Sequence, residues 1–81
     1  MSSFGTVTLK EVRAMLETCA PGHVFRAHGV HYFLVAFHGQ TFPSLPTGPH
    51  GKGNPDIQVG VVRRMAKRLG ILACAIRELQ L

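Results

Sequence analysis

Apolar residues recur at helical spacing in two stretches of the chain, and alternating strand-like segments lie between them. The first stripe consists of Leu9, Val12, Met15, Leu16 and Cys19. Thr8 and Glu11 form a capping box at its start, because a threonine hydroxyl can accept from the third helical N–H while the glutamate reaches back. Ala20-Pro21-Gly22 interrupts the pattern, since Pro21 disfavours the helical conformation of Ala20. We therefore predict a helix over 9–19.

Three segments after this helix favour β-strands. His23–His28 alternates loosely, His31–His38 is rich in aromatic and branched residues, and Thr41–Leu45 contains Pro43, which is typical of an edge strand. One face of the second segment carries His31, Phe33, Val35 and Phe37, and the other carries Tyr32, Leu34, Ala36 and His38. Both faces are mostly apolar, so we expect that a partner covers the second face or that it serves as a binding platform.

The C-terminal third of the chain predicts a second helix and a short tail helix. Asn54-Pro55-Asp56 indicates a helix start, with Asn as N-cap, Pro at the first position and an acid in the first turn. Apolar residues follow at Ile57, Val61, Met65 and Leu69, with Val62 beside them, and Gly70 is the expected terminator. Residues 73–80 indicate a further helix. We find no internal repeat.

These patterns predict an α+β fold in one domain, 1–81. Its element order is α-β-β-β-α, with a three-stranded antiparallel sheet and two helices on one face. Residues 1–7 are expected to be an N-terminal extension, and 72–81 a helical tail.

Charge narrows the choice of partners. The 81 residues carry nine Lys and Arg against four Asp and Glu, a formal net charge of +5. Such a domain favours nucleic acid, an acidic protein or an anionic membrane surface. No run of 18 apolar residues exists to span a bilayer, and the first residues lack the pattern of a secretory signal. We therefore expect a cytoplasmic protein in which Cys19 and Cys74, although able to pair, stay reduced.

Two groups of residues are candidates for chemistry. His31 comes just after a glycine turn, at the head of a strand, and an ordinary imidazole titrates near neutral pH, as proton transfer to and from RNA would require. The alternative is a histidine that only bonds a backbone carbonyl. The cations Arg63, Arg64, Lys67 and Arg68, with Arg26 and Lys52, are candidates for a phosphate-binding face, and the alternative is a solvated helix surface.

The glycine-rich loop and the remaining histidines suggest further candidate sites with weaker sequence signals. Residues 48–53, G-P-H-G-K-G, lack the spacing of a phosphate-binding P-loop, so they either hold a phosphate or simply connect two elements. His28 and His50 are possible secondary acid–base groups or RNA contacts. A zinc site would have to draw on Cys19, His23, His28, His31 and His38, whose spacing lacks a recognised metal-binding pattern. We expect no metal and no cofactor.

Three segments together resemble the HicA-type toxins, also called the YcfA-like family, which are mRNA interferases. They are G29-V30-H31, G48-P49-H50 and the helix G60-V-V-R-R-M-A-K-R-L-G-I71, and the resemblance covers residues 8–71. It implies a fold like that of double-stranded-RNA-binding domains, with RNA cleavage by the strand histidine, His31, without a metal. It also implies neutralisation by a HicB-like antitoxin. The chain departs from the family's frequent G-S-H-H, which here is Gly29-Val30-His31-Tyr32.

Two functions follow as expectations. The first is a HicA-like toxin, an endoribonuclease that binds mRNA through the cations and uses His31 as general acid–base. The second is a nucleic-acid-binding or protein-interaction module, of phage or prophage type, that keeps the fold without the chemistry. An exposed apolar face would also allow a homodimer.

Overall fold

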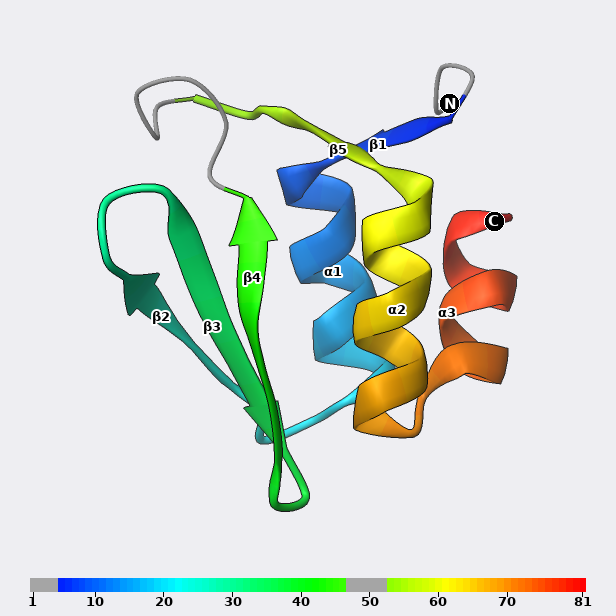
Figure 1. Ribbon diagram of the computed structural model, residues 1–81. Helices are drawn as coiled ribbons and strands as arrows, with labels where there is room; N and C mark the ends of the chain where they lie inside the picture. The colour runs from blue at the N-terminus through cyan, green and yellow to red at the C-terminus, as the bar shows by residue number, and fades with distance from the viewer. Residues whose placement is uncertain (1–4, 47–52) are drawn as a thin grey trace.

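The computed structural model describes residues 5–46 and 53–81, and its elements follow the predicted order with two short strands added (Figure 1). The elements are β1 (Thr6–Thr8), α1 (Leu9–Cys19), β2 (Val24–His28), β3 (Tyr32–Phe37), β4 (Gln40–Pro46), β5 (Asp56–Gln58), α2 (Val59–Leu69) and α3 (Leu72–Leu79). The first helix has the predicted bounds, and its capping box is present. The Thr8 hydroxyl accepts from the Glu11 N–H at 3.2 Å, and the Glu11 carboxylate accepts from the Thr8 N–H at 2.8 Å.

The central strands form an antiparallel sheet in the order β2-β3-β4, which confirms the predicted α+β class and three-stranded sheet. The β2–β3 register runs from Val24 opposite Ala36 to His28 opposite Tyr32, and a register shift interrupts β3–β4 between Phe33 and Val35. Pro43 lies in an edge strand, as predicted, because a proline cannot donate to a further ladder.

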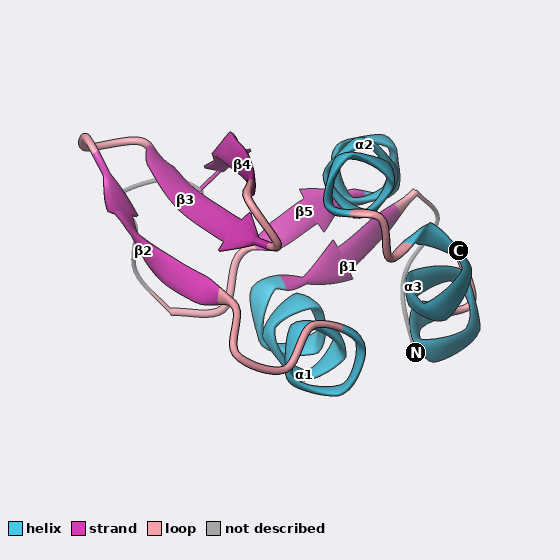
Figure 2. Cartoon of the chain, turned by 90° about the horizontal axis from the view of Figure 1, so that it is seen from below, coloured by secondary structure: helices cyan, strands magenta, loops and turns pink. Residues whose placement is uncertain are grey.

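Both α1 and α2 pack on the same face of this sheet (Figure 2). Val35 is completely buried there, and Phe42 and Leu45 of β4 join the same core. Side chains alternate along a strand, so Tyr32 and Leu34 point to the opposite face. Among the described elements none covers that face, and Tyr32 keeps 45% of its surface exposed.

β1 and β5 were not predicted, and they correct two expectations. Thr6–Thr8 belongs to a strand rather than to an N-terminal extension. Asp56–Gln58 is a strand rather than the first turn of a helix, so α2 begins at Val59 with Gln58 at its N-cap. The two strands pair antiparallel, with Val7 opposite Ile57, and both of these side chains are buried. Pairing with a partner 50 residues away therefore overrides the local helix-start signal.

The paired strands and the helices that follow them form two equivalent βα units, 6–19 and 56–69, offset by 50 residues. The Leu9 N–H donates to the Pro55 carbonyl at 2.8 Å, and the equivalent Val59 N–H donates to the Gly5 carbonyl at 2.8 Å. Both helices run in the same direction away from the β1–β5 pair (Figure 1). The two units are thus related by an approximate two-fold axis.

Burial follows the same repeat. The buried positions of α1 are Val12, Met15 and Leu16, and those at the equivalent positions of α2 are Val62, Met65 and Ala66. Leu69 is also buried, as predicted, but Val61 is only partly buried, because the helix begins later and is rotated relative to the predicted stripe. Gly70 ends α2 in the left-handed conformation, with φ of 76°, as expected of a glycine at that position.

A third helix covers the side of the α1–α2 pair away from the sheet (Figure 2). It confirms the predicted tail helix, and it buries Ala75 and half-buries Leu72 and Leu79 against the core. A disulfide between Cys19 and Cys74 ties it to the end of α1, with 5.7 Å between the two Cα atoms. The expectation of reduced thiols is therefore wrong, because the tail folds back and brings Cys74 to a residue 55 positions earlier.

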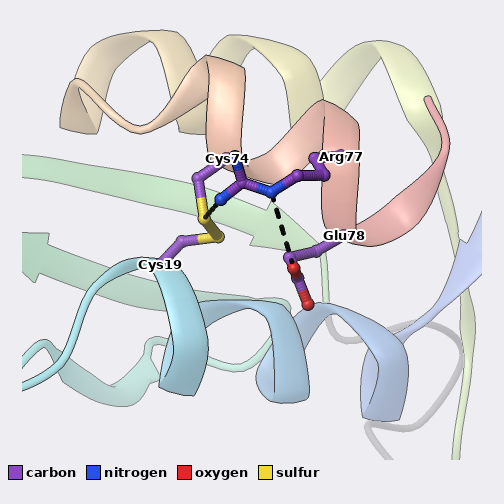
Figure 3. Close-up of polar contacts among 4 residues, drawn as sticks. All are labelled: Cys19, Cys74, Arg77 and Glu78. Carbon is purple, nitrogen blue, oxygen red and sulfur yellow. Dashed lines mark hydrogen bonds and ion pairs between the residues drawn. A yellow bond between two sulfur atoms is a disulfide. The ribbon is translucent and has the colours of Figure 1, made fainter.

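The disulfide has two charged neighbours on the tail helix (Figure 3). Arg77 Nη2 lies 3.6 Å from Cys74 Sγ, and Arg77 Nε lies 3.9 Å from Glu78 Oε2. Both side chains are largely at the surface, so these contacts add little to the stability that the covalent link provides.

Candidate functional site

Four cations form a continuous stripe on the solvent side of α2. The members of this α2 stripe are Arg63, Arg64, Lys67 and Arg68, all exposed. Their spacing of one, four and five residues places them on one side of the helix, away from the buried residues Val62, Met65 and Leu69. None of the four side chains makes an ion pair or hydrogen bond with another described residue, and α2 itself contains no acid. The stripe is therefore four positive charges available to a ligand.

The two-fold repeat shows that this charge is not needed by the scaffold. The α1 residues equivalent to the stripe are Arg13, Ala14, Glu17 and Thr18, and they are exposed in the same way. Their formal charge is zero, compared with +4 on α2. The two helices bury residues at equivalent positions and follow two strands that pair with each other. They therefore differ chiefly in the charge that they present to solvent.

The structure does not bring Arg26 to the stripe. Phe25 points to the helices, since the guanidinium of Arg13 lies over its ring, 4.5 Å from the centroid. Its neighbour Arg26 therefore points to the uncovered face of the sheet, where it is exposed and lies opposite Leu34. Lys52 and His50, which the sequence also suggested, lie outside the described residues.

His31 stands in the turn between β2 and β3 and not within a strand. It is exposed, next to Val30, whose side chain is 83% exposed, and its ring has no hydrogen-bond partner among the described residues. His28 ends β2 and is exposed as well. The alternative in which His31 only bonds a backbone carbonyl therefore does not describe this turn.

His31 and the end of the α2 stripe lie at opposite ends of the molecule. The β2–β3 turn lies at the end of the sheet where α1 and α2 begin, whereas the last turn of α2 lies toward the β3–β4 turn (Figure 1). The structure therefore does not bring His31 together with Lys67 and Arg68, the stripe cations nearest the end of α2.

The other histidines have local roles. The His23 side chain is buried, with 7% exposure, and its Nδ1 lies 2.8 Å from the Ala20 carbonyl, while Nε2 lies 4.0 Å from Glu17 Oε2. His38 adopts a φ of 50° in the β3–β4 turn and stacks on Phe37, with ring centroids 3.9 Å apart. Within residues 5–46 and 53–81 no three His, Cys, Asp or Glu side chains gather as a metal site would require.

Sequence reasoning missed the cations of α1. Lys10 and Arg13 line a hollow with Leu9, Gly53 and Asn54, where the first turn of α1 meets the segment before β5. Their spacing of three residues on the exposed side of a predicted helix was a usable signal. The contact of Asn54 with Lys10 could not be predicted from the sequence, because the two residues lie 44 positions apart.

No helix in the described part of the chain is long and apolar enough to cross a membrane. The chain matches no family model, no curated protein and no solved structure.

Proposed function

We propose that this protein is an RNA-binding domain that contacts phosphates through the α2 stripe. The observation that carries the proposal is the charge difference between the two equivalent helices. Arg64, Lys67 and Arg68 replace an alanine, a glutamate and a threonine at positions where the fold accepts either kind of residue. Exposed cations without acidic neighbours repel one another, so they are better explained by an anionic ligand than by folding.

The size of the stripe suits a polyanion. Arg63 and Arg68 are separated by about 7.5 Å along the helix axis, at a rise of about 1.5 Å per residue. One strand of a DNA duplex carries a phosphate about every 3.4 Å along the helix axis, so the distance between Arg63 and Arg68 spans about two phosphate steps. Arginine binds phosphate oxygens through two parallel N–H groups. The resemblance to the HicA-type toxins and to double-stranded-RNA-binding domains favours RNA over DNA as the ligand.

The test is RNA affinity measured by fluorescence anisotropy over a range of salt concentrations. Each cation that neutralises a phosphate contributes about 0.7 to 0.9 to the slope of log Kobs against log salt. The variant Arg63→Gln/Arg64→Gln/Lys67→Gln/Arg68→Gln is expected to bind weakly and to reduce the slope by about 3.

A matched control for the single substitutions removes one positive charge from another surface. Arg26→Gln alters a cation on the uncovered face of the sheet, and each single stripe variant should have a larger effect on affinity than this one. An unchanged slope in the quadruple variant, with its fold intact by circular dichroism, would refute the proposed interface.

A second candidate, the endoribonuclease, is favoured by the exposed ring of His31, which has no hydrogen-bond partner in residues 5–46 and 53–81. In that reaction the 2′-hydroxyl loses its proton to a base and attacks the adjacent phosphorus. The P–O5′ bond breaks, and O5′ takes a proton from an acid, so the products are a 2′,3′-cyclic phosphate and a 5′-hydroxyl end.

The two candidate functions predict different effects of substituting His31. For a nuclease, His31→Ala should abolish cleavage and growth arrest on induced expression in a bacterium, while RNA affinity stays unchanged. For a binding domain, neither wild type nor His31→Ala cleaves RNA, and only the stripe variants have an effect. A HicB-like acidic antitoxin would be the protein partner of the endoribonuclease, and it would compete with RNA for the stripe in a cytoplasmic setting.

A further inference from the structure

The hollow beside the first turn of α1 is a second place where cations lie together, and its described lining contains no carboxylate. It has a volume of about 440 Å³ and is lined by Leu9, Lys10 and Arg13 of α1 and by Gly53 and Asn54. That volume is within the range of pockets that hold small ligands or single nucleotides.

The backbone at this helix start is already satisfied by the protein. The Leu9 N–H donates to the Pro55 carbonyl at 2.8 Å, the Lys10 N–H donates to Asn54 Oδ1 at 2.7 Å, and the Glu11 N–H donates to Thr8 Oγ1 at 3.2 Å. A ligand in the hollow would therefore be held by side chains and not by free helix N–H groups. Since its Oδ1 accepts from Lys10, the amide of Asn54 can offer its NH2 donors to a ligand, and no described residue accepts from them.

Arg13 is held in place from the sheet side. Its guanidinium lies over the Phe25 ring at 4.5 Å, and that ring packs against Phe33 with centroids 4.8 Å apart. A guanidinium stacked by its face keeps its N–H groups in the plane, where they can meet two oxygens of one phosphate. The stacking thus reduces the side-chain entropy that would be lost on binding.

The charge balance of the hollow favours an anion. Neither Lys10 nor Arg13 forms an ion pair within the described residues, and the described lining includes no carboxylate. The nearest acid on the same helix turn, Glu11, accepts from Thr8 instead, through both its backbone N–H and its hydroxyl. Its negative charge is therefore engaged with the helix cap.

The approximate two-fold repeat again serves as a comparison. The α2 residue equivalent to Lys10 is Gly60, and in the sequence the residue 50 positions before Asn54 is Phe4. The Lys10–Asn54 hydrogen bond thus has no counterpart in the other unit, whereas the bonds of Leu9 and Val59 to residues 55 and 5 are shared. The bonds that both units share hold the two helix starts in place. The polar side chains of the hollow are present in one unit alone, so the scaffold does not require them.

We propose that the Lys10–Arg13 hollow binds a phosphate group of the nucleic acid ligand, at a site separate from the α2 stripe. This inference rests on the proposed function for the identity of its ligand. The hollow lies at the same end of the molecule as the β2–β3 turn that holds His31, since α1 begins there (Figure 1). Lys10 and Arg13 therefore lie nearer to that end than Lys67 and Arg68, which stand in the last turn of α2.

The test is a titration followed by amide chemical shifts of the full chain. Inorganic phosphate is expected to shift the Lys10, Arg13 and Asn54 amides saturably, and Lys10→Gln/Arg13→Gln should weaken that binding at least fivefold. The matched control, Lys67→Gln/Arg68→Gln, removes the same charge from the stripe and should leave the phosphate shifts at the hollow unchanged.

Oligoribonucleotides identify the source of the phosphate. A 5′-phosphorylated strand that shifts the hollow residues more than its unphosphorylated twin indicates a terminal phosphate, and equal shifts indicate an internal phosphodiester. Phosphate shifts spread evenly over all cations, or unchanged in Lys10→Gln/Arg13→Gln, would overturn the proposal.

The outcomes also separate this site from the proposed interface. RNA that shifts the stripe but not the hollow removes only this inference. If phosphate binds the hollow but RNA does not shift the amides of the stripe, only the proposed interface is refuted. Well-dispersed spectra of each variant establish that the fold is retained.

Discussion

The Cys19–Cys74 disulfide should supply a large part of the stability of this domain. It closes a loop with a sequence separation of 55 between the end of α1 and the start of α3. The chain-entropy relation for a loop of that length gives about 4 kcal/mol at 25 °C. A domain of this size is stable by only about 4 to 12 kcal/mol in total, so the link is comparable to the net stability.

The perturbation is removal of the link in two independent ways, by dithiothreitol and by the variant Cys19→Ala/Cys74→Ala. Thermal unfolding followed by circular dichroism at 222 nm should show Tm lower by about 15 to 30 °C, since a domain of this length loses roughly 4 to 8 °C for each kcal/mol. Urea unfolding should also show a larger m-value without the link, because the unlinked chain exposes more surface when it unfolds.

Controls separate the covalent link from other effects. The double alanine variant should be insensitive to dithiothreitol, and Arg77→Gln, which changes only a surface neighbour of Cys74, should leave Tm within about 2 °C of wild type. The reasoning is refuted if mass spectrometry of the non-reduced protein counts two free thiols. It is equally refuted if dithiothreitol leaves Tm unchanged while the thiols are shown to be reduced.

Three further predictions concern the helices. The Thr8 N–H donates to the Glu11 carboxylate and holds the pKa of that carboxyl below its ordinary value of 4.5. The cap therefore stabilises the fold above that pH and loses its contribution as the pH falls through the lowered pKa. In urea unfolding at a series of pH values, Glu11→Gln should weaken the loss of stability on the acidic side. Gly70→Ala should cost about 1 kcal/mol, because an alanine is strained at φ of 76°, and a Tm equal to that of wild type would contradict this. Met15→Ala and Met65→Ala occupy equivalent, fully buried positions, so each should cost about 2 to 5 kcal/mol in chemical unfolding, and a large difference between them would argue against the two-fold repeat as the organiser of the core.

The site was partly visible in the sequence. Arg63, Arg64, Lys67 and Arg68 stand on one helix, and helical spacing alone predicts that they share a solvent-facing side. Arg26 could not be placed in the same way, since the face on which it lies depends on which side of β2 the helices cover. Whether His31 accompanies the stripe depends on the length and direction of three strands, and the structure places the β2–β3 turn at the opposite end from the last turn of α2.

What the sequence determined by itself is the local structure: the bounds of α1, its capping box, the three central strands, the end of α2 at Gly70 and the tail helix. Each depends on residues within one or two helical turns or one strand, where spacing and caps act directly. Only the tertiary structure decided the pairing of β1 with β5, the disulfide and the Lys10–Asn54 contact. These join residues 44 to 55 positions apart, and a three-residue strand or a lone cysteine carries too little local preference to specify a partner at that distance.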